Sequence, residues 1–93
     1  WTPLHHASLR GHLPVVQYLC EQGADKRATD EINWWTPLHI AAYNGHLPIV
    51  KYLCEQKVNQ DARSKLDRTP LYLAKKYQHT KVVRYLKQCQ QSS

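Results

Sequence analysis

The chain has 93 residues, a formal net charge of +6 and 42% hydrophobic residues. This length allows one domain, and no apolar run reaches the ~18–20 residues that a membrane-spanning helix needs. With only three glycines, the composition also argues against a glycine-rich loop that cradles phosphate groups.

Positive charge is concentrated in the second half of the chain. Residues 1–46 carry three basic and four acidic side chains, whereas residues 47–93 carry ten basic and three acidic ones. A solvated surface on the last structural unit is the simplest explanation, and an acidic partner is the alternative. Nucleic acid is disfavoured because no nucleic-acid-binding module is recognisable.

The chain begins with a pattern of two short helices. Thr2 is a suitable N-cap and Pro3 suits the first helical position. Gly11 is expected to end this helix after little more than two turns. Pro14 then falls in the first turn of a second helix, which Gly23 stops. The apolar stripe predicted for this second helix consists of Val15, Val16, Leu19 and Cys20.

This pattern occurs three times along the chain. Thr2-Pro3-Leu4-His5 reappears as Thr36-Pro37-Leu38-His39 and as Thr69-Pro70-Leu71-Tyr72, at offsets of 34 and then 33 residues. Residues 1–22 and 35–56 are identical at 16 of 22 aligned positions. Self-similarity at a period of ~20–50 residues indicates a stacked repeat array, which lacks the buried cleft of most enzymes.

The later units depart from the first in informative ways. Lys57 stands where Gly23 stood, so we expect fraying or strain at that helix end. The third unit has Lys75, Gln78 and Lys87 where the second has small or apolar residues. Such polar replacements are typical of an outermost repeat, so the third unit is predicted to be a C-terminal cap.

The pattern Thr-Pro-Leu-His-x-Ala, followed by Gly-His-Leu, an apolar helix and Gly-Ala-Asp, resembles the ankyrin repeat over nearly the whole chain. The resemblance implies an all-α-dominated repeat solenoid of helix–loop–helix units joined by β-hairpin-like loops. It suggests an N-terminally truncated repeat at about 1–29, a second at about 30–62, a capping repeat at about 63–90 and a tail at 91–93. We accordingly expect the chain to be a piece of a longer protein.

The two connecting loops differ from the family pattern. The loop before Thr36 is one residue longer than the loop before Thr69, and Trp34 is interpreted as the added residue. Asn33 is placed where the family has a turn glycine, and Asp67 takes that place in the second loop. Asn tolerates the left-handed backbone conformation better than most residues.

No catalytic or metal-binding pattern is recognisable. His5 and His39 match the family's motif histidine, which bridges towards the adjoining repeat. Equivalent histidines lie a repeat apart and cannot converge on one tetrahedral metal ion. The three cysteines are expected to be free and mostly buried in a reducing compartment. We therefore predict no enzymatic activity, no metal, no cofactor, no membrane association and an intracellular, cytoplasmic location.

The resemblance implies binding of a protein partner by a concave surface of loop tips and first helices. Residues that break the repeat at these places are the predicted contacts: Leu9, Arg10, Glu31, Ile32, Trp34, Trp35, Tyr43, Asn44, Lys65, Leu66, Arg68, Lys76 and Tyr77. Trp34 and Tyr43 are the predicted anchors, because aromatic residues dominate interface energetics. Three of the cations are predicted to give charge complementarity: Lys65, Arg68 and Lys76.

Alternatives to this prediction stay open. The array could be a structural spacer within a larger protein, or it could bind an acidic polymer through its basic C-terminal half. Polymer binding would fall steeply with salt. Trp35, like Trp1, could instead pack back on its own helix, and the same alternative applies to Trp34. The apolar face of the uncapped first unit also predicts weak self-association.

Overall fold

The computed structural model describes residues 1–91, and this part of the chain forms six α-helices and no strand. The helices are α1 (Pro3–Arg10), α2 (Leu13–Glu21), α3 (Pro37–Asn44), α4 (Leu47–Glu55), α5 (Pro70–Lys76) and α6 (Thr80–Gln91). The predicted all-α class is confirmed. Of the predicted tail, Gln91 is the last residue of α6, and residues 92–93 lie outside the described part.

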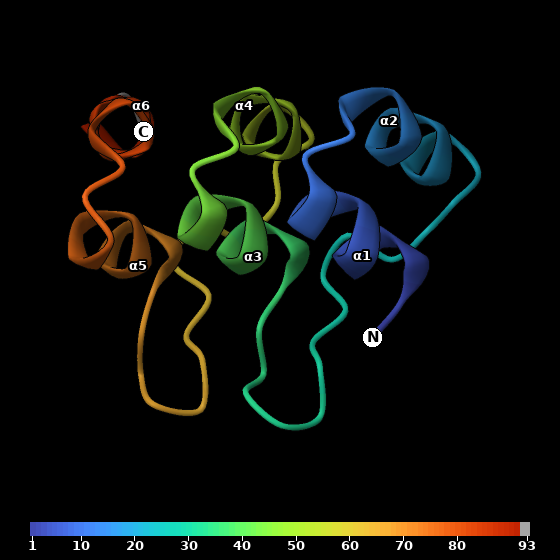
Figure 1. Cartoon of the computed structure of the whole chain (residues 1–93), viewed down its shortest axis with the longest axis horizontal. Coiled ribbons are helices and arrows are strands. Elements are labelled where there is room, and N and C mark those ends of the chain that lie inside the picture. Colours follow the sequence, from blue (N-terminus) through green and yellow to red (C-terminus); the bar gives the residue numbers. More distant parts are fainter. Residues whose placement is uncertain (92–93) are drawn as a thin grey trace.

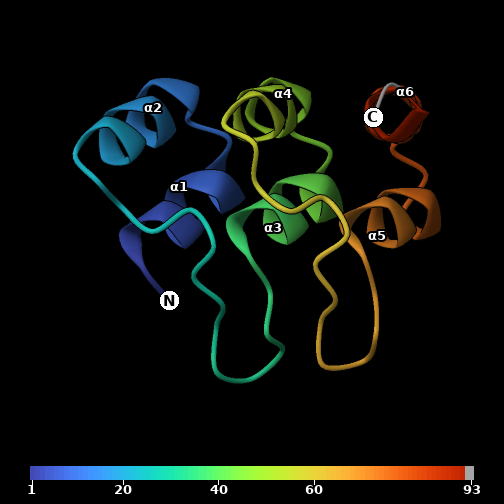
Figure 2. The same cartoon turned by 180° about the vertical axis from the view of Figure 1, so that it is seen from behind.

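The helices form two rows, with α1, α3 and α5 in one and α2, α4 and α6 in the other (Figure 1). Each helix contacts its partner in the same unit and the equivalent helix of the neighbouring unit. The loops that precede α3 and α5 extend away from both rows, as the view from behind also shows (Figure 2). The core is therefore a repeated layer between the rows and between neighbouring units.

Each helix of the first row begins at the predicted threonine cap. The Oγ1 atoms of Thr2 and Thr36 accept hydrogen bonds from the backbone N–H groups of His5 and His39. In return, the Thr36 N–H donates to Nδ1 of His39 at 3.1 Å. This reciprocal arrangement satisfies two N–H groups that the helix itself leaves unpaired. Thr69 caps α5 through its bond to the Tyr72 N–H alone.

The turns between the paired helices of the first two units require glycine for two separate reasons. Gly11 and Gly45 have φ of 76° and 72°, in the left-handed region that L-residues seldom adopt. A Cβ at Gly11 would also lie 2.8 Å from the His46 ring, and one at Gly45 would lie 2.5 Å from the His79 ring. Gln78 has φ of 62° at the equivalent place in the last unit.

The expected strain after α4 is confirmed. Lys57 has φ of 61°, whereas Gly23 at the equivalent position after α2 has φ of 90°. A lysine side chain therefore occupies a conformation in which its Cβ crowds the backbone.

The predicted apolar stripe is complete only in the central unit. There Ile49, Val50, Leu53 and Cys54 are all buried. On α2, Val16 and Cys20 are buried, but Val15 is 45% exposed and Leu19 is half-buried. The stripe assigned to α2 is thus partly wrong, because within residues 1–91 no helix packs against the side of α2 that faces away from α4. The same positions on α4 are covered by α2.

Candidate functional site

The first loop is organised by a buried carboxylate that sequence reasoning missed. Asp30 is 5% exposed, and its Oδ1 accepts hydrogen bonds from the N–H groups of Asn33 and Trp34, at 2.6 and 3.1 Å. The Asp30 N–H donates to the Trp35 carbonyl at 3.1 Å. An aspartate that begins a turn is the signal that could have identified this role.

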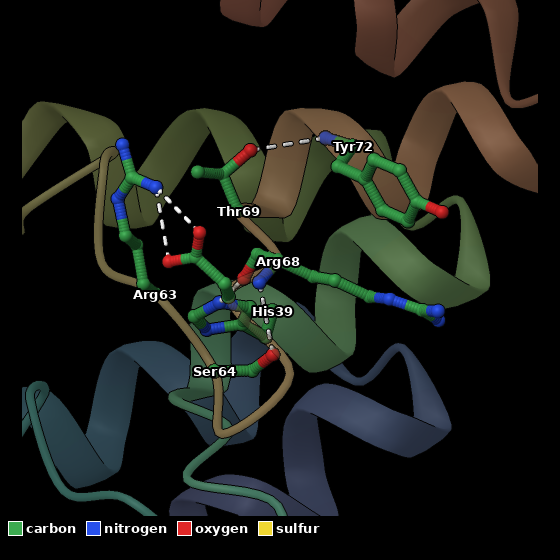
Figure 3. Close-up of polar contacts among 7 residues, drawn as sticks. His39, Arg63, Ser64, Arg68, Thr69 and Tyr72 are labelled. Atoms are coloured by element: carbon green, nitrogen blue, oxygen red, sulfur yellow. Dashed lines mark hydrogen bonds and ion pairs between the residues drawn. The ribbon is translucent and has the colours of Figure 1, made fainter.

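The second loop is closed by a serine in place of the aspartate. The Ser64 N–H donates to the Arg68 carbonyl at 2.9 Å, and Ser64 Oγ accepts the Arg68 N–H at 3.2 Å (Figure 3). Arg63 pairs with Asp67 at 2.9 Å, and both side chains are largely exposed. Solvent screens such a pair, so it contributes little to stability. The backbone and hydroxyl bonds therefore set the shape of this loop.

These bonds correct the predicted register of the first loop. Trp34 has φ of 60° and Asp67 has φ of 63°, so the two residues occupy the same left-handed position. The expectation for Asp67 is confirmed, but in the first loop Trp34, and not Asn33, replaces the turn glycine. The added residue therefore lies among residues 31–33. Counting residues could not reveal this position. The hydrogen bond that closes the first loop, from Asp30 to Trp35, spans one residue more than the bond that closes the second, from Ser64 to Arg68.

Buried histidines attach each loop to the helix of the preceding unit. His5 Nε2 bonds the Trp35 carbonyl, and His39 Nε2 bonds the Arg68 carbonyl, both at 2.9 Å. A carbonyl only accepts, so Nε2 carries the proton in both rings. Figure 3 shows His39 beside Arg68. The predicted bridge towards the adjoining repeat is confirmed.

Burial lowers the pKa of His39 from its ordinary value. The carbonyls of Arg68 and Ala62 and the carboxylate of Asp30 act in the opposite direction but are smaller effects. The ring is therefore neutral near pH 7. Its Nδ1 is then free to accept the Thr36 N–H while Nε2–H holds the next loop.

A second set of histidines links the units at the other end of the first-row helices. His46 Nε2 donates to the Leu9 carbonyl at 2.9 Å, and His79 Nε2 donates to the Tyr43 carbonyl at 2.8 Å. Among residues 1–91 no three His, Cys, Asp or Glu side chains are grouped so that they could hold a metal ion. These four histidines have structural partners in the backbone.

The structure brings three predicted contact residues into one aromatic row, formed by Trp35, Tyr43 and Tyr77. The ring centroids of Trp35 and Tyr43 are 5.1 Å apart. Those of Tyr43 and Tyr77 are 4.5 Å apart at an interplanar angle of 63°, an edge-to-face contact. Trp35 also stacks towards His39 on its own helix, with centroids 6.4 Å apart. The alternative that Trp35 packs back on its helix is thus confirmed, and the residue is half-buried.

Exposed apolar side chains extend from the two loops. Ile32 is 77% exposed, Leu66 is 70% exposed and Trp34 is 50% exposed. The loops are joined to each other, since the Lys65 N–H donates to the Asn33 carbonyl at 2.9 Å. We refer to Ile32, Trp34 and Leu66 as the loop-tip cluster. Exposed apolar groups of this size on linked loops are typical of contact surfaces.

Two predicted cations lie against aromatic rings. The Arg68 guanidinium is 5.0 Å from the centroid of Tyr72, and Lys76 Nζ is 5.8 Å from that of Tyr77. Both distances are within the range of a cation–π contact. Lys65, the third predicted cation, is exposed at the second loop tip. Positive charge therefore lies beside the end of the aromatic row.

The remaining predicted contacts are placed less centrally. Leu9 is 38% exposed and Arg10 is exposed, but both lie on α1, in the neighbouring unit. The amide of Asn44 donates to the Ile40 carbonyl of its own helix at 2.9 Å, so one of its two N–H donors is already used. Glu31 and Ile32 instead border a hollow of about 440 Å³. The other residues that line it are Trp1, Thr2, Thr29 and Asp30.

The cysteines have the properties of core residues. Within residues 1–91, Cys20, Cys54 and Cys89 form no disulfide, and the first two are buried. Burial, reinforced by the neighbouring thiol of Cys89, raises the pKa of Cys54 to about 12. Burial also raises the pKa of Cys20. Because the thiolate is the reactive form, both buried thiols are poor nucleophiles at neutral pH.

Comparison with known proteins supplies the family. A family model described as "Ankyrin repeats (3 copies)" matches residues 27–92. A second, described as "Ankyrin repeat", matches residues 1–31. No curated protein matches the chain. Within residues 1–91 no helix is both long enough and apolar enough to cross a membrane.

Proposed function

Because this chain belongs to the ankyrin repeat family, we propose that it binds a partner protein through the surface formed by its loops and first-row helices. Ankyrin repeats are generally protein–protein interaction modules, and proteins built from them are typically non-enzymatic. The thirteen residues predicted from the sequence outline this surface. The aromatic row and the loop-tip cluster form its centre.

The observation that carries the proposal is that the aromatic row begins at Trp35, in the loop that also bears Ile32 and Trp34 of the loop-tip cluster. The aromatic row is continuous from the first loop to the end of α5. The loop-tip cluster extends from the same loops into solvent. Binding energy concentrates in a few aromatic and apolar anchors that a partner can cover completely. Such a partner would bury both groups at once.

The conformation of Trp34 supports its role as an anchor. A bulky residue at φ of 60° is an outlier, and such positions cost on the order of 1–3 kcal/mol. A glycine would avoid this cost, and Asp67 shows that a small polar residue also fits the position. The indole contributes no buried core contact large enough to explain its presence, since it is 50% exposed.

Electrostatic complementarity is the second component of the proposal. Lys65, Arg68 and Lys76 give the α5 side of the surface a positive charge, whereas Glu31 is exposed beside the first loop tip. A partner with acidic residues at one end of its contact area would match this distribution. Such charges mainly increase the association rate.

The test begins with capture of a partner by the folded chain and identification by mass spectrometry. The affinity of that partner is then compared for wild type, Trp34→Ala and Tyr43→Ala. Each substitution is expected to weaken binding by about 2 kcal/mol or more if the residue is an anchor. Charge reversal at Lys65 and Lys76 is expected mainly to slow association and to change its salt dependence.

Matched variants separate binding from folding. Tyr43→Phe keeps the ring between Trp35 and Tyr77, and Trp34→Gly keeps the left-handed turn without the indole. Gln17→Ala, on α2, is expected to leave affinity unchanged. If Gln17→Ala abolishes binding while Trp34→Ala and Tyr43→Ala are silent, the surface is wrongly assigned. If the folded chain captures no partner at all, the spacer alternative is favoured.

We also propose an intracellular, cytoplasmic location. Its support is that the cysteines of residues 1–91 form no disulfide. Thiols persist in reducing compartments, whereas disulfides are favoured outside them. Imaging of the full-length protein would test this.

A further inference from the structure

A second surface lies in the other row of helices, between α4 and α6 (Figure 1). A shallow groove of about 270 Å³ follows this helix pair. The residues that line it are Leu47, Lys51, Lys81, Arg84, Tyr85 and Gln88. None of them belongs to the loops or to the first-row helices. The groove is therefore a surface separate from the one proposed above.

The residues that line the groove carry positive charge, and Glu55, whose carboxylate acts on Tyr85, lies beside the groove without being part of its lining. Lys51, Lys81 and Arg84 are exposed, and no aspartate or glutamate is among the lining residues. The Lys51 ammonium lies 5.8 Å from the centroid of the Tyr85 ring. Three cations that converge on one concave surface repel one another, and an anionic ligand would relieve that repulsion.

The repeat itself provides an internal comparison. At the equivalent positions between α2 and α4, Gln17, Pro48 and Glu55 stand where Lys51, Lys81 and Gln88 line the groove. Each of the three differences makes the α4–α6 groove more positive. Leu47 and Tyr85, by contrast, keep the residue types of Leu13 and Tyr52. The scaffold is thus repeated and only the charge is changed.

The role of the third unit as a cap does not explain this charge. A cap needs polar residues on the side that faces away from the stack. Lys75, Gln78 and Thr80 line a separate hollow, with Val83. Lys81 and Arg84 instead face the groove shared with α4. A requirement for solubility would also be met by acidic residues, which this groove lacks.

The dimensions favour an extended chain over a single ion. From Lys81 to Gln88 the helix advances about 10 Å, which matches about three residues of an extended peptide. A lone phosphate would occupy only part of a groove of that length. Single-stranded nucleic acid needs exposed aromatic rings for base stacking, but Tyr85 is half-buried. Leu47 adds an apolar side chain to the lining of the groove.

We propose that the α4–α6 groove binds an acidic segment of a partner protein in extended conformation. Its carboxylates meet Lys51, Lys81 and Arg84, and an apolar side chain between them rests on Leu47. The ligand class is a peptide that carries several Asp or Glu residues around a leucine-like residue.

The test uses a fluorescein-labelled peptide, Gly-Glu-Glu-Leu-Glu-Glu-Gly, and the whole chain, followed by fluorescence anisotropy at about 50 mM salt. The triple variant Lys51→Gln/Lys81→Gln/Arg84→Gln is expected to bind about tenfold more weakly than wild type. A control of equal net charge, Arg27→Gln/Lys57→Gln/Lys75→Gln, removes exposed cations elsewhere and is expected to change affinity less than about twofold. Circular dichroism confirms that both variants are folded.

Several outcomes would overturn the proposal. Absence of wild-type binding would do so, and so would an equal loss in the two triple variants, which would indicate diffuse charge attraction. Displacement of the peptide by inorganic phosphate alone would indicate a single-ion site. An oligonucleotide of equal charge that binds as tightly, with the same dependence on the three cations, would indicate a nucleic-acid groove.

Trp34→Ala and Tyr43→Ala are expected to leave peptide binding unchanged, so the two proposed surfaces can fail separately.

Discussion

At the scale of single residues, histidine and threonine act together as the joints of this array. His39 receives the Thr36 N–H at Nδ1 and holds the next loop through Nε2–H. One ring therefore caps a helix and joins two units. Its double role needs the neutral form, because a protonated Nδ1 could no longer accept. The joint is consequently sensitive to acid.

The first prediction follows from the direction of the His39 pKa shift. The folded-state pKa lies below the ordinary value of 6.5, so the unfolded chain takes up the proton first as pH falls. Stability should be full above about pH 6.5 and should decrease below it, down to the folded-state pKa. His39→Gln, which keeps a donor towards the Arg68 carbonyl, should show a shallower pH dependence. Urea unfolding of the wild type and the variant between pH 7.5 and pH 5 measures how the free energy of unfolding depends on pH. The same dependence in both proteins would contradict this role of His39.

At the scale of the helices, stability comes from burial more than from caps. Leu53 on α4 is completely buried between units. Thr36 contributes a local cap at the start of α3. Removing buried methyl groups leaves a cavity that neighbours cannot fill, whereas removing a cap leaves one N–H group unpaired.

The second prediction ranks these two effects. Leu53→Ala should lower the free energy of unfolding by about 2–5 kcal/mol, and Thr36→Ala should lower it by about 1 kcal/mol. Midpoints of guanidinium unfolding give both values. A smaller loss for Leu53→Ala than for Thr36→Ala would mean that α4 is packed differently from the structure described here.

The third prediction concerns the end of α4. Lys57 has φ of 61°, and a glycine there should raise the free energy of unfolding by about 1 kcal/mol through relief of backbone crowding. Lys57→Ala removes the charge but keeps the Cβ, and should not stabilise the protein. Equal effects of the two substitutions would assign the gain to charge and not to the backbone.

At the scale of the whole molecule, the ends of the stack differ from its middle. Val15 is 45% exposed and Tyr18 is 60% exposed. The equivalent Ile49 is buried, and Tyr52 is half-buried, where α4 meets α2. The side of α2 that faces away from α4 therefore presents apolar groups that the repeat covers elsewhere. Such patches favour association between copies.

The fourth prediction is weak, concentration-dependent self-association through this side of α2. Sedimentation velocity over increasing protein concentration should show a rising average mass. Val15→Gln/Tyr18→Gln should suppress it without changing the helical content. A strict monomer for the wild type at high concentration would rule this association out.

Local chemistry explains what the sequence by itself determined. The caps at Thr2, Thr36 and Thr69 and the turn at Gly11 depend on groups within a few residues of each other. The period of the repeat then implied a stack of similar units. The repeated motif indicated the family and, with it, the all-α class. Asp67 was placed correctly because its loop has the ordinary length.

Only the tertiary structure decided which of these residues meet. The register of Trp34 depends on the buried carboxylate of Asp30, and counting residues does not reveal it. The edge-to-face contact of Tyr43 with Tyr77 joins two units, and the exposure of Val15 depends on which side of α2 is covered. The basic groove likewise needs α4 and α6 side by side. A repeating sequence specifies equivalent residues, but burial and contact depend on neighbours that differ from one unit to the next.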